Sequence, residues 1–261
     1  MAKTFFRNTT LIRDQIAVLV QKDFKLKYNS TALGFAWCLL VPLMMSGVYY
    51  LVFGVILKVG RVPNYFLYLI SGNFLWQFFS GVVMQNGTVL TRNATLLKKT
   101  NFDESLLIWG TFFSEGIHFL LVIPVLAGAM ALYRVPPQWW SIPVNLLGAA
   151  AAITLLAVGM SYLYAALNLI FRDLERMMRI IMQIWLYASP VFIPVTMIPE
   201  TWRFWYMLNP MAAIMTMWRG IFYAPTLDGS LFLPALLVSA AIYLLGRRVF
   251  CKLRPIFAER M

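Results

Sequence analysis

Long apolar stretches alternate with short polar segments along the chain, and the apolar stretches have the length of a bilayer crossing. A helix that crosses the hydrocarbon core needs about 20 consecutive, mostly apolar residues. By this criterion the pattern predicts six transmembrane helices, at residues 34–57, 65–90, 106–133, 142–170, 180–195 and 231–246. The polar segments between them are too short for a large soluble domain. The predicted fold is therefore an all-α integral membrane protein.

The N-terminal segment has an amphipathic pattern. Apolar residues recur at helical spacing along one face of residues 8–28, namely Ile12, Ile16, Leu19 and Val20. Its basic residues lie largely elsewhere around the helix. Such a helix lies in the membrane interface, with its basic residues among lipid head groups. We expect an amphipathic interface helix in a cytoplasmic segment that spans residues 1–33.

The segment before the last span is hydrophobic but irregular. Residues 196–230 are interrupted by prolines at Pro199, Pro210 and Pro225. Because proline breaks helices, we expect short re-entrant outer helices here rather than a full crossing. The chain then divides into the interface helix at 1–33, a six-helix transmembrane domain at 34–250 and a cytoplasmic tail at 251–261.

The second predicted span is unusually rich in glycine and amide residues, with Gly72, Asn73, Gly81, Asn86 and Gly87. Small residues allow helices to approach closely in a membrane. A break followed by re-entry would use the same residues. The pattern leaves both interpretations open.

Composition and charge agree with a membrane protein. Hydrophobic residues make up 61% of the chain and charged residues only 12%, against about 25% charged residues in soluble domains. Seventeen of the 22 lysines and arginines fall in residues 1–33, 91–105, 171–179 and 247–261. Basic loops favour the cytoplasmic side. We therefore expect a multi-pass protein of the bacterial inner membrane with both termini cytoplasmic, and the net charge of +12 does not point to nucleic acid.

Motifs of catalysis and metal binding are missing from the sequence. It contains no G-x-x-x-x-G-K-[ST], H-E-x-x-H or C-x-x-C pattern, and Cys38 and Cys251 have no metal-ligand spacing. We expect no cofactor and no metal in this chain. Glu115 and His118 lie three residues apart on one face of the third span. They fit structural hydrogen bonding inside the bundle, and they also fit a proton relay or a substrate contact.

Aromatic residues form 16% of the chain. Many tryptophans fall near predicted span ends, as in an interfacial belt. Others could stack against sugar rings along a channel. Trp37, Trp185 and Tyr187 lie closer to span interiors, so we assign these three to the channel.

Several segments in order resemble one family. They are RDQIAVLVQKDFKLKYNSTALGFAW at 13–37, NATLLKKTNF at 93–102, NLIFRD at 168–173, Ser189-Pro190-Val191, Asn209-Pro210 and Trp218-Arg219. Together they resemble the permease subunits of type-2 ABC exporters for polysaccharides such as O-antigen, capsule and teichoic acid. The resemblance covers almost the whole chain. It implies a homodimeric channel, two copies of a separate P-loop ATPase that binds ATP and Mg, and a lipid-linked glycan as substrate.

The resemblance also implies roles for particular residues. It assigns ATPase coupling to Asp23, Lys25, Lys27, Tyr28, Arg172, Asp173, Glu175 and Arg176. The substrate entrance falls to Lys98 and Lys99, whose charges suit a diphosphate head group. The outer gate falls to Ser189, Pro190, Asn209, Pro210 and Trp218. Arg172 and Glu175 have the spacing of an ion pair within a short helix.

Other interpretations of the same residues stay open. The basic clusters also fit positive-inside anchoring, and the 171–179 connector also fits a solvated charged turn. An exporter of a small lipid or drug would have the same architecture. A glycan- or lipid-modifying membrane enzyme would use His118 and Glu115, and it would work without an ATPase. The resemblance favours a channel-forming permease that is not itself an enzyme.

Overall fold

The computed structural model of the chain describes residues 2–28, 36–59, 62–99, 102–136, 139, 142–171, 173–223 and 232–260. The regular secondary structure of these residues is helical, and no strand is present among them. The helices are α1 (Ala2–Tyr28), α2 (Trp37–Tyr49), the π-helix η2 (Tyr50–Ile56), α3 (Tyr65–Gly87), α4 (Val89–Arg92), α5 (Ala94–Lys99), α6 (Glu104–Leu120), α7 (Val122–Leu132), α8 (Ile142–Ile170), α9 (Leu174–Tyr187), the 3₁₀ turn η3 (Val195–Met197), α10 (Glu200–Met207), α11 (Pro210–Arg219) and α12 (Phe232–Arg260). Side chains are described except at 2–11, 28, 99, 232 and 258–260.

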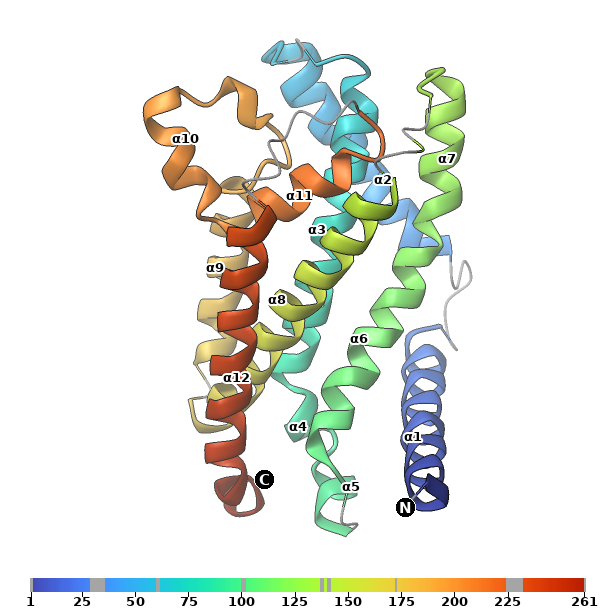
Figure 1. Cartoon of the computed structure of the whole chain (residues 1–261), viewed down its shortest axis with the longest axis vertical. Coiled ribbons are helices and arrows are strands. Elements are labelled where there is room, and N and C mark those ends of the chain that lie inside the picture. The colour runs from blue at the N-terminus through green and yellow to red at the C-terminus, as the bar shows by residue number, and fades with distance from the viewer. Residues whose placement is uncertain are drawn as a thin grey trace.

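Five helical stretches among the described residues are long and apolar enough to cross a membrane. They are Trp37–Ile56, Tyr65–Gly87, Glu104–Leu132, Ile142–Ile170 and Leu233–Phe257. These stretches confirm the predicted all-α membrane fold, and they overlap five of the six predicted spans. Figure 1 shows both chain ends at the lower end of the bundle, together with α5, and the short helices α10 and α11 near the upper end.

The predicted fifth span, 180–195, is wrong in its bounds and length. Helix α9 begins earlier, at Leu174, and ends at Tyr187 after 14 residues, which is short for a crossing. The apolar run continues through Val191 and Ile193, but the backbone there forms turns around Pro190. Hydrophobicity alone cannot locate that end, because proline stops a helix without interrupting the apolar pattern.

The last helix is longer than the predicted 231–246. Helix α12 runs on through Arg247 and Arg248 to Arg260. Arginine and lysine are good helix formers, so they can mark the edge of the hydrocarbon without ending the helix. The tail therefore continues α12, and Arg254 Nη2 lies 2.7 Å from Glu104 Oε2 at the start of α6.

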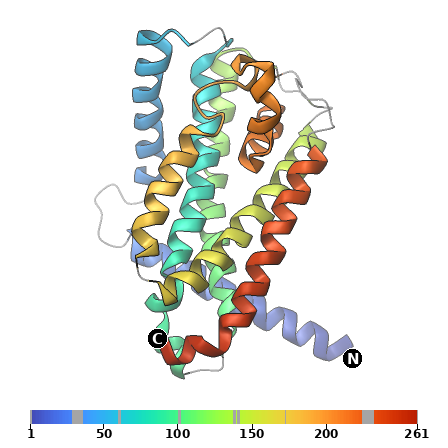
Figure 2. The ribbon, with the colours of Figure 1, turned by 90° about the vertical axis from the view of Figure 1, so that its left-hand side faces the viewer.

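The predicted N-terminal helix and the predicted short outer helices are both present among the described residues. The amphipathic segment 8–28 lies within α1, and the proline-rich outer segment holds the short helices α10 and α11. Figure 2 shows α1 crossing the lower end of the bundle at a large angle to the other helices. Asn209 caps α11 by accepting a hydrogen bond from the Met211 amide at 3.0 Å, and Pro210 occupies the first turn.

Helix α3 is the most buried of the five candidate spans and packs against α2, α6, α7, α8, α9 and α11. It is continuous, so its small residues serve close packing rather than a break. Gly87 lies against the Tyr164 ring, where a Cβ would overlap that ring. The amide of Asn86 donates to Ser161 Oγ at 3.1 Å, and that of Asn168 donates to the Gly87 carbonyl at 2.9 Å.

The most extensive helix contact is between α8 and α12, and glycines make it possible. A Cβ on Gly159 would lie 2.6 Å from Tyr243 Cα, and a Cβ on Gly246 would overlap the Gly159 carbonyl. Without a hydrophobic driving force between helices in lipid, such close backbone contact supplies the packing energy.

Gly159→Ala is expected to force α8 and α12 apart and to lower the midpoint of thermal unfolding in detergent. The cost of overpacking is about 1–3 kcal/mol. Gly116→Ala is the matched control, because a Cβ there meets no atom within 4 Å. A Gly159→Ala protein with the same midpoint of thermal unfolding as the wild type would contradict this packing argument.

Candidate functional site

The interface helix α1 docks on α6 through one face. A Cβ on Gly110 would lie 3.1 Å from Leu19 Cβ, so the two helices touch there. The Phe24 ring centroid lies 4.7 Å from that of His118. Lys22 Nζ donates to Asn93 Oδ1 at 2.7 Å, beside α4 and α5. Apolar and polar contacts thus join α1 to the bundle at several points.

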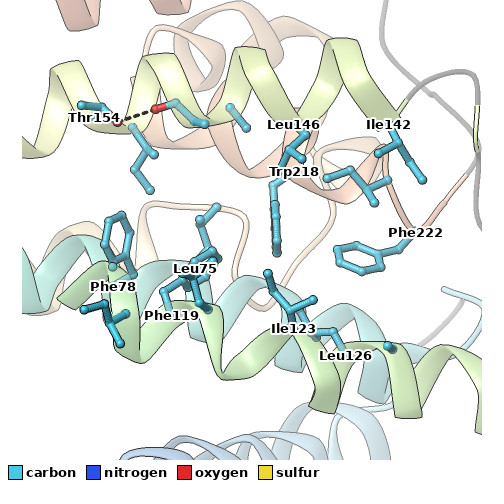
Figure 3. Close-up of a pocket in the computed structure, with 18 of the residues that line it drawn as sticks. Leu75, Phe78, Phe119, Ile123, Leu126, Ile142, Leu146, Thr154, Trp218 and Phe222 are labelled. Atoms are coloured by element: carbon cyan, nitrogen blue, oxygen red, sulfur yellow. Dashed lines mark hydrogen bonds between the residues drawn. The ribbon is translucent and has the colours of Figure 1, made fainter. Parts of the chain in front are cut away.

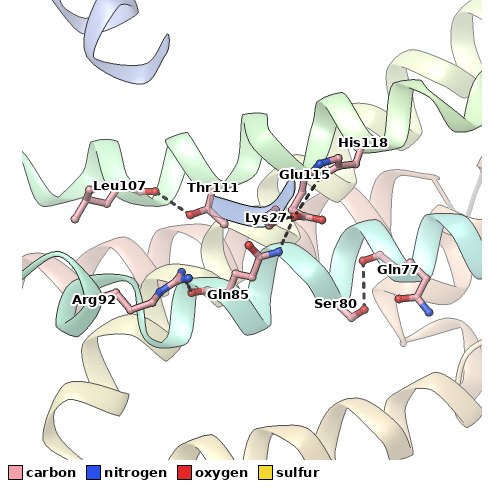
Figure 4. Close-up of polar contacts among 9 residues, drawn as sticks. All are labelled: Lys27, Gln77, Ser80, Gln85, Arg92, Leu107, Thr111, Glu115 and His118. Carbon is pink, nitrogen blue, oxygen red and sulfur yellow. Dashed lines mark hydrogen bonds and ion pairs between the residues drawn. The ribbon is translucent and has the colours of Figure 1, made fainter. Parts of the chain in front are cut away.

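The carboxylate of Glu115, on α6, contacts side chains from α1 and α3 at this junction. Lys27 of α1 forms an ion pair with Glu115 Oε1, and Gln85 Nε2 of α3 donates to the same oxygen at 2.5 Å. His118 Nδ1 lies 3.5 Å from it. Figure 4 shows the four side chains, which we call the Glu115 cluster, converging between α3 and α6. The Glu115 side chain is only 13% exposed.

Gly81 of α3 leaves space for the Glu115 carboxylate. A Cβ at that position would lie 2.9 Å from Glu115 Oε2. An ionised group within a span must be paired or solvated by protein, because hydrocarbon cannot solvate it. The geometry is the one that structural hydrogen bonding by Glu115 and His118 requires. The sequence identified this pair but missed Gln85 and the pairing of Lys27, although a glutamine inside an apolar span was the available signal.

A second polar network holds the outer segment. Asn209 Oδ1 accepts from Trp185 Nε1 at 2.8 Å. The amide of Asn209 donates to the Ala188 carbonyl at 3.0 Å and to Ser189 Oγ at 3.1 Å. The turn after α9 is therefore bonded directly to the start of α11. This brings together Ser189 and Asn209, two of the residues that the resemblance assigns to an outer gate.

Arg219 lies at the centre of the same end and is 6% exposed. Its guanidinium donates to the carbonyls of Pro190, Tyr68 (3.0 Å) and Val191 (3.1 Å), and Cζ lies 3.4 Å from the Tyr68 ring centroid. Beside it, Trp218 Nε1 donates to the Ser71 carbonyl at 3.0 Å. We call Tyr68, Pro190, Val191, Trp218 and Arg219 the Arg219 cluster.

The Arg219 cluster also depends on a glycine of α3. A Cβ on Gly72 would overlap the Arg219 guanidinium. Planar guanidinium suits this site, because it donates several bonds in a fixed fork and stacks on aromatic rings. The sequence placed Trp218 in the outer gate but did not assign Arg219. A single arginine in an apolar segment was the signal for it.

The residues expected to couple to an ATPase are only partly brought together. Lys25, Asp173 and Arg176 are exposed, whereas Lys27 turns inward to Glu115. Burial raises the pKa of the half-buried Asp23 carboxyl, and Lys27 opposes that shift. The Tyr28 side chain and the whole of Arg172 lie outside the described residues. Glu175 pairs with Arg179 at 3.0 Å, across one helical turn. Lys98 is exposed on α5, and the Lys99 side chain lies outside the described residues.

The three assigned channel aromatics have different surroundings. Trp37 is 44% exposed at the start of α2, and Tyr187 is exposed at the end of α9. Trp185 is half-buried, with its ring 5.2 Å from that of Phe79 and its indole bonded to Asn209. Trp37 and Tyr187 can thus meet a ligand directly, while Trp185 also holds the outer network.

A large apolar cavity of about 560 Å³ lies between α3, α6, α7, α8 and α11. Figure 3 shows Phe78, Phe119, Leu146 and Trp218 pointing into it. Thr154 contributes a hydroxyl, which donates to the Ala150 carbonyl at 2.6 Å. The lining fits hydrocarbon and offers no charged group to a sugar or a phosphate.

Comparison with known proteins identifies the family. Residues 14–223 match the family described as ABC-2 type transporter. The chain belongs to this family. An ABC-2 type transporter chain is a component of a transporter, which favours transport over the membrane-enzyme interpretation of Glu115 and His118.

The relatives of this ABC-2 type transporter chain are similar over almost its whole length. It is 32% identical over 255 residues to an O-antigen export system permease protein RfbA of Klebsiella pneumoniae, covering 97% of this chain and 96% of the relative. It is 30% identical over 251 residues to a protein of the same name from Myxococcus xanthus, covering 95% of each.

The Glu115 cluster of this transporter chain should be energetically coupled. Lys27→Met and Glu115→Leu are each expected to lower the unfolding midpoint in detergent, because each leaves a charge unpaired in a largely buried site. The double variant should lose less than the sum, by about 1–3 kcal/mol. The exposed pair Glu175–Arg179 is the matched control, with a coupling of about 0.3–0.5 kcal/mol. Additive losses at Lys27 and Glu115 would refute the coupling.

Arg219→Lys is expected to destabilise the outer segment despite the retained charge. Lysine cannot reproduce three carbonyl contacts and a ring stack, and the loss should be about 2–4 kcal/mol. Limited proteolysis around α10, with the unfolding midpoint, measures it. Arg203→Lys on the more exposed α10 is the control and should change neither readout. An Arg219→Lys protein as resistant as the wild type would show that charge alone suffices.

Proposed function

We propose that this chain is the transmembrane subunit of an ATP-driven exporter that moves a lipid-linked, O-antigen-like polysaccharide across the bacterial inner membrane. Two copies form the channel, and two copies of a separate P-loop ATPase bind ATP and Mg. The observation that carries the proposal is the similarity, over nearly the whole chain, to permeases named for O-antigen export.

The orientation follows from the basic residues. Segments rich in lysine and arginine, including α1, α5 and the end of α12, lie at the end of the bundle that holds both termini (Figure 1). Positive charge favours the cytoplasmic side. Both termini and the ATPase contact are therefore proposed to be cytoplasmic, and the Arg219 cluster to lie toward the outer side.

Helix α9 supports a water-filled channel. Arg179, Gln183 and Tyr187 recur every fourth residue and are all exposed in the single chain. A stripe of charged and amide groups is costly to place against lipid, because hydrocarbon solvates neither. A second copy of the chain that encloses this stripe would place it along an aqueous path. The aromatic ring of Tyr187 at its outer end suits weak contact with successive sugars.

In this mechanism the ATPases act on two cytoplasmic elements. One is α1, whose movement reaches α3 and α6 through the Glu115 cluster. The other is the start of α9, where Asp173 and Arg176 are exposed. Rigid movement of α3 and α9 would then alter the turn at Ser189, which the outer network holds. Repeated cycles would move a long polymer without one tight binding site.

A strain that lacks the chain is expected to lose polysaccharide from its surface and to accumulate lipid-linked glycan inside, because the proposed export step is missing. The wild-type chain should restore export and co-purify in mild detergent with a P-loop ATPase. Immunoblotting of surface glycan and mass spectrometry of the complex measure both results. Normal surface polysaccharide in the deletion strain would refute the proposed function.

Arg176→Glu tests the ATPase contact in the same strain. Reversing an exposed charge in the first turn of α9 should lower ATPase recovery by at least about tenfold, since like charges across an interface cost several kcal/mol. Arg203→Glu, near the opposite end of the bundle, is the matched control. Equal ATPase recovery with both variants would place the contact elsewhere.

A further inference from the structure

A second cavity lies beside the Glu115 cluster and differs from the large apolar one. It has a volume of about 300 Å³ and lies between α1, α2, α3 and α6. Its polar lining residues are Lys27, Gln77, Gln85, Glu115 and His118. Its apolar and aromatic lining includes Trp37, Val41, Pro42 and Phe74. Phe78 and Phe119 line both cavities, so their rings, 5.2 Å apart, stand between the two.

Two recognition groups at this cavity are not used by the fold among the described residues. The Gln77 side-chain amide and the Trp37 indole make no hydrogen bond to any described residue, and Trp37 makes no ring contact among them. The ion pair of Glu115 with Lys27 and its hydrogen bond from Gln85 both end on Oε1. Its Oε2 lies next to Gly81, which also lines the cavity. The cavity therefore offers an acceptor, an amide and an aromatic face.

The charges at this cavity select against an anion. Lys27 is neutralised by its ion pair with Glu115, so it offers no unbalanced positive charge. The neighbouring carboxylate oxygen would repel a phosphate. A neutral polyhydroxyl compound matches better, because a carboxylate and an amide can each bond to hydroxyl groups. The C–H face of a sugar ring can also lie on an indole, which is amphipathic and rigid.

We propose that this cavity binds one neutral sugar unit of the transported glycan, with Trp37 as the stacking surface and Gln77 and Glu115 Oε2 as hydrogen-bonding groups. The assignment rests on the proposed export of a glycan and adds a defined subsite to it. Its size suits a single ring rather than a long segment of polymer. Since α1, α3 and α6 all line it, movement of α1 would change the shape of the subsite.

Photo-crosslinking in the native cell tests the subsite with the cell's own lipid-linked glycan as the probe. A benzophenone amino acid replaces Val41, an exposed residue on the cavity wall. We expect sugar-containing adducts, detected by glycan immunoblot and absent from cells that cannot make the polymer. Leu244, exposed on α12, is the control position and should give none.

Second substitutions identify the residues that hold the sugar. In the chain that carries the benzophenone amino acid at position 41, Trp37→Ala and Gln77→Leu should each lower the yield of glycan adduct by about fivefold. This corresponds to the loss of one contact. Trp37→Phe should retain most of it. Neither Trp37 nor Gln77 bonds to the Glu115 cluster, so the fold should persist, and unchanged unfolding midpoints would verify this.

The outcomes separate the subsite from the proposed function. If the Val41 crosslinking chain restores export but yields only phospholipid adducts, or none, the subsite is refuted while glycan export stands. Glycan adducts that survive both Trp37→Ala and Gln77→Leu also refute it. Normal surface glycan in the deletion strain would instead refute the export function itself.

Discussion

The structure depends on one constraint, which is that hydrocarbon cannot solvate a polar group, so the chain must satisfy its own polar groups wherever water is excluded. Glu115 shows the consequence at one end, where its carboxylate is shared by residues from α1, α3 and α6. Arg219 shows it at the other end, where carbonyls of α3 and of the turn after α9 surround the guanidinium. Each buried charge therefore joins elements that are far apart in sequence.

The same constraint explains where the glycines fall. Gly81 admits the Glu115 carboxylate and Gly72 admits the Arg219 guanidinium, both on α3. Lipid supplies no hydrophobic force between helices, so helices associate by close contact and polar bonds. Gly159 and Gly246 provide such contact between α8 and α12 without any charge. Small residues thus perform two tasks here, which are helix packing and access for a buried ion.

Hydrophobic periodicity predicted most of the fold, because bilayer thickness sets a length that sequence alone reveals. It failed where the apolar run and the helix end at different residues. After α9 the apolar run continues past Pro190 although the helix has ended, and α12 continues through Arg247 although the apolar run has ended. For the site, the resemblance named Ser189 and Asn209 as members of one region, but the hydrogen bond between them could not be predicted from the sequence. The sequence did not reveal which residue pairs with the buried Glu115 carboxylate. Which lysine approaches Glu115 depends on how α1 crosses α6, and no local pattern encodes that angle.

Helix α3 links the two charged ends and gives the chain a route for long-range movement. It carries Gln85 and Gly81 near the Glu115 carboxylate, and Gly72 and Tyr68 near the Arg219 guanidinium. A continuous, closely packed helix moves as a unit more readily than it bends, since packed interiors transmit displacement. A shift of α1 that displaces Glu115 would therefore also displace the carbonyls around Arg219. Because those bonds have fixed directions, the outer turn would either move with α3 or lose its hydrogen bonds to the Arg219 guanidinium.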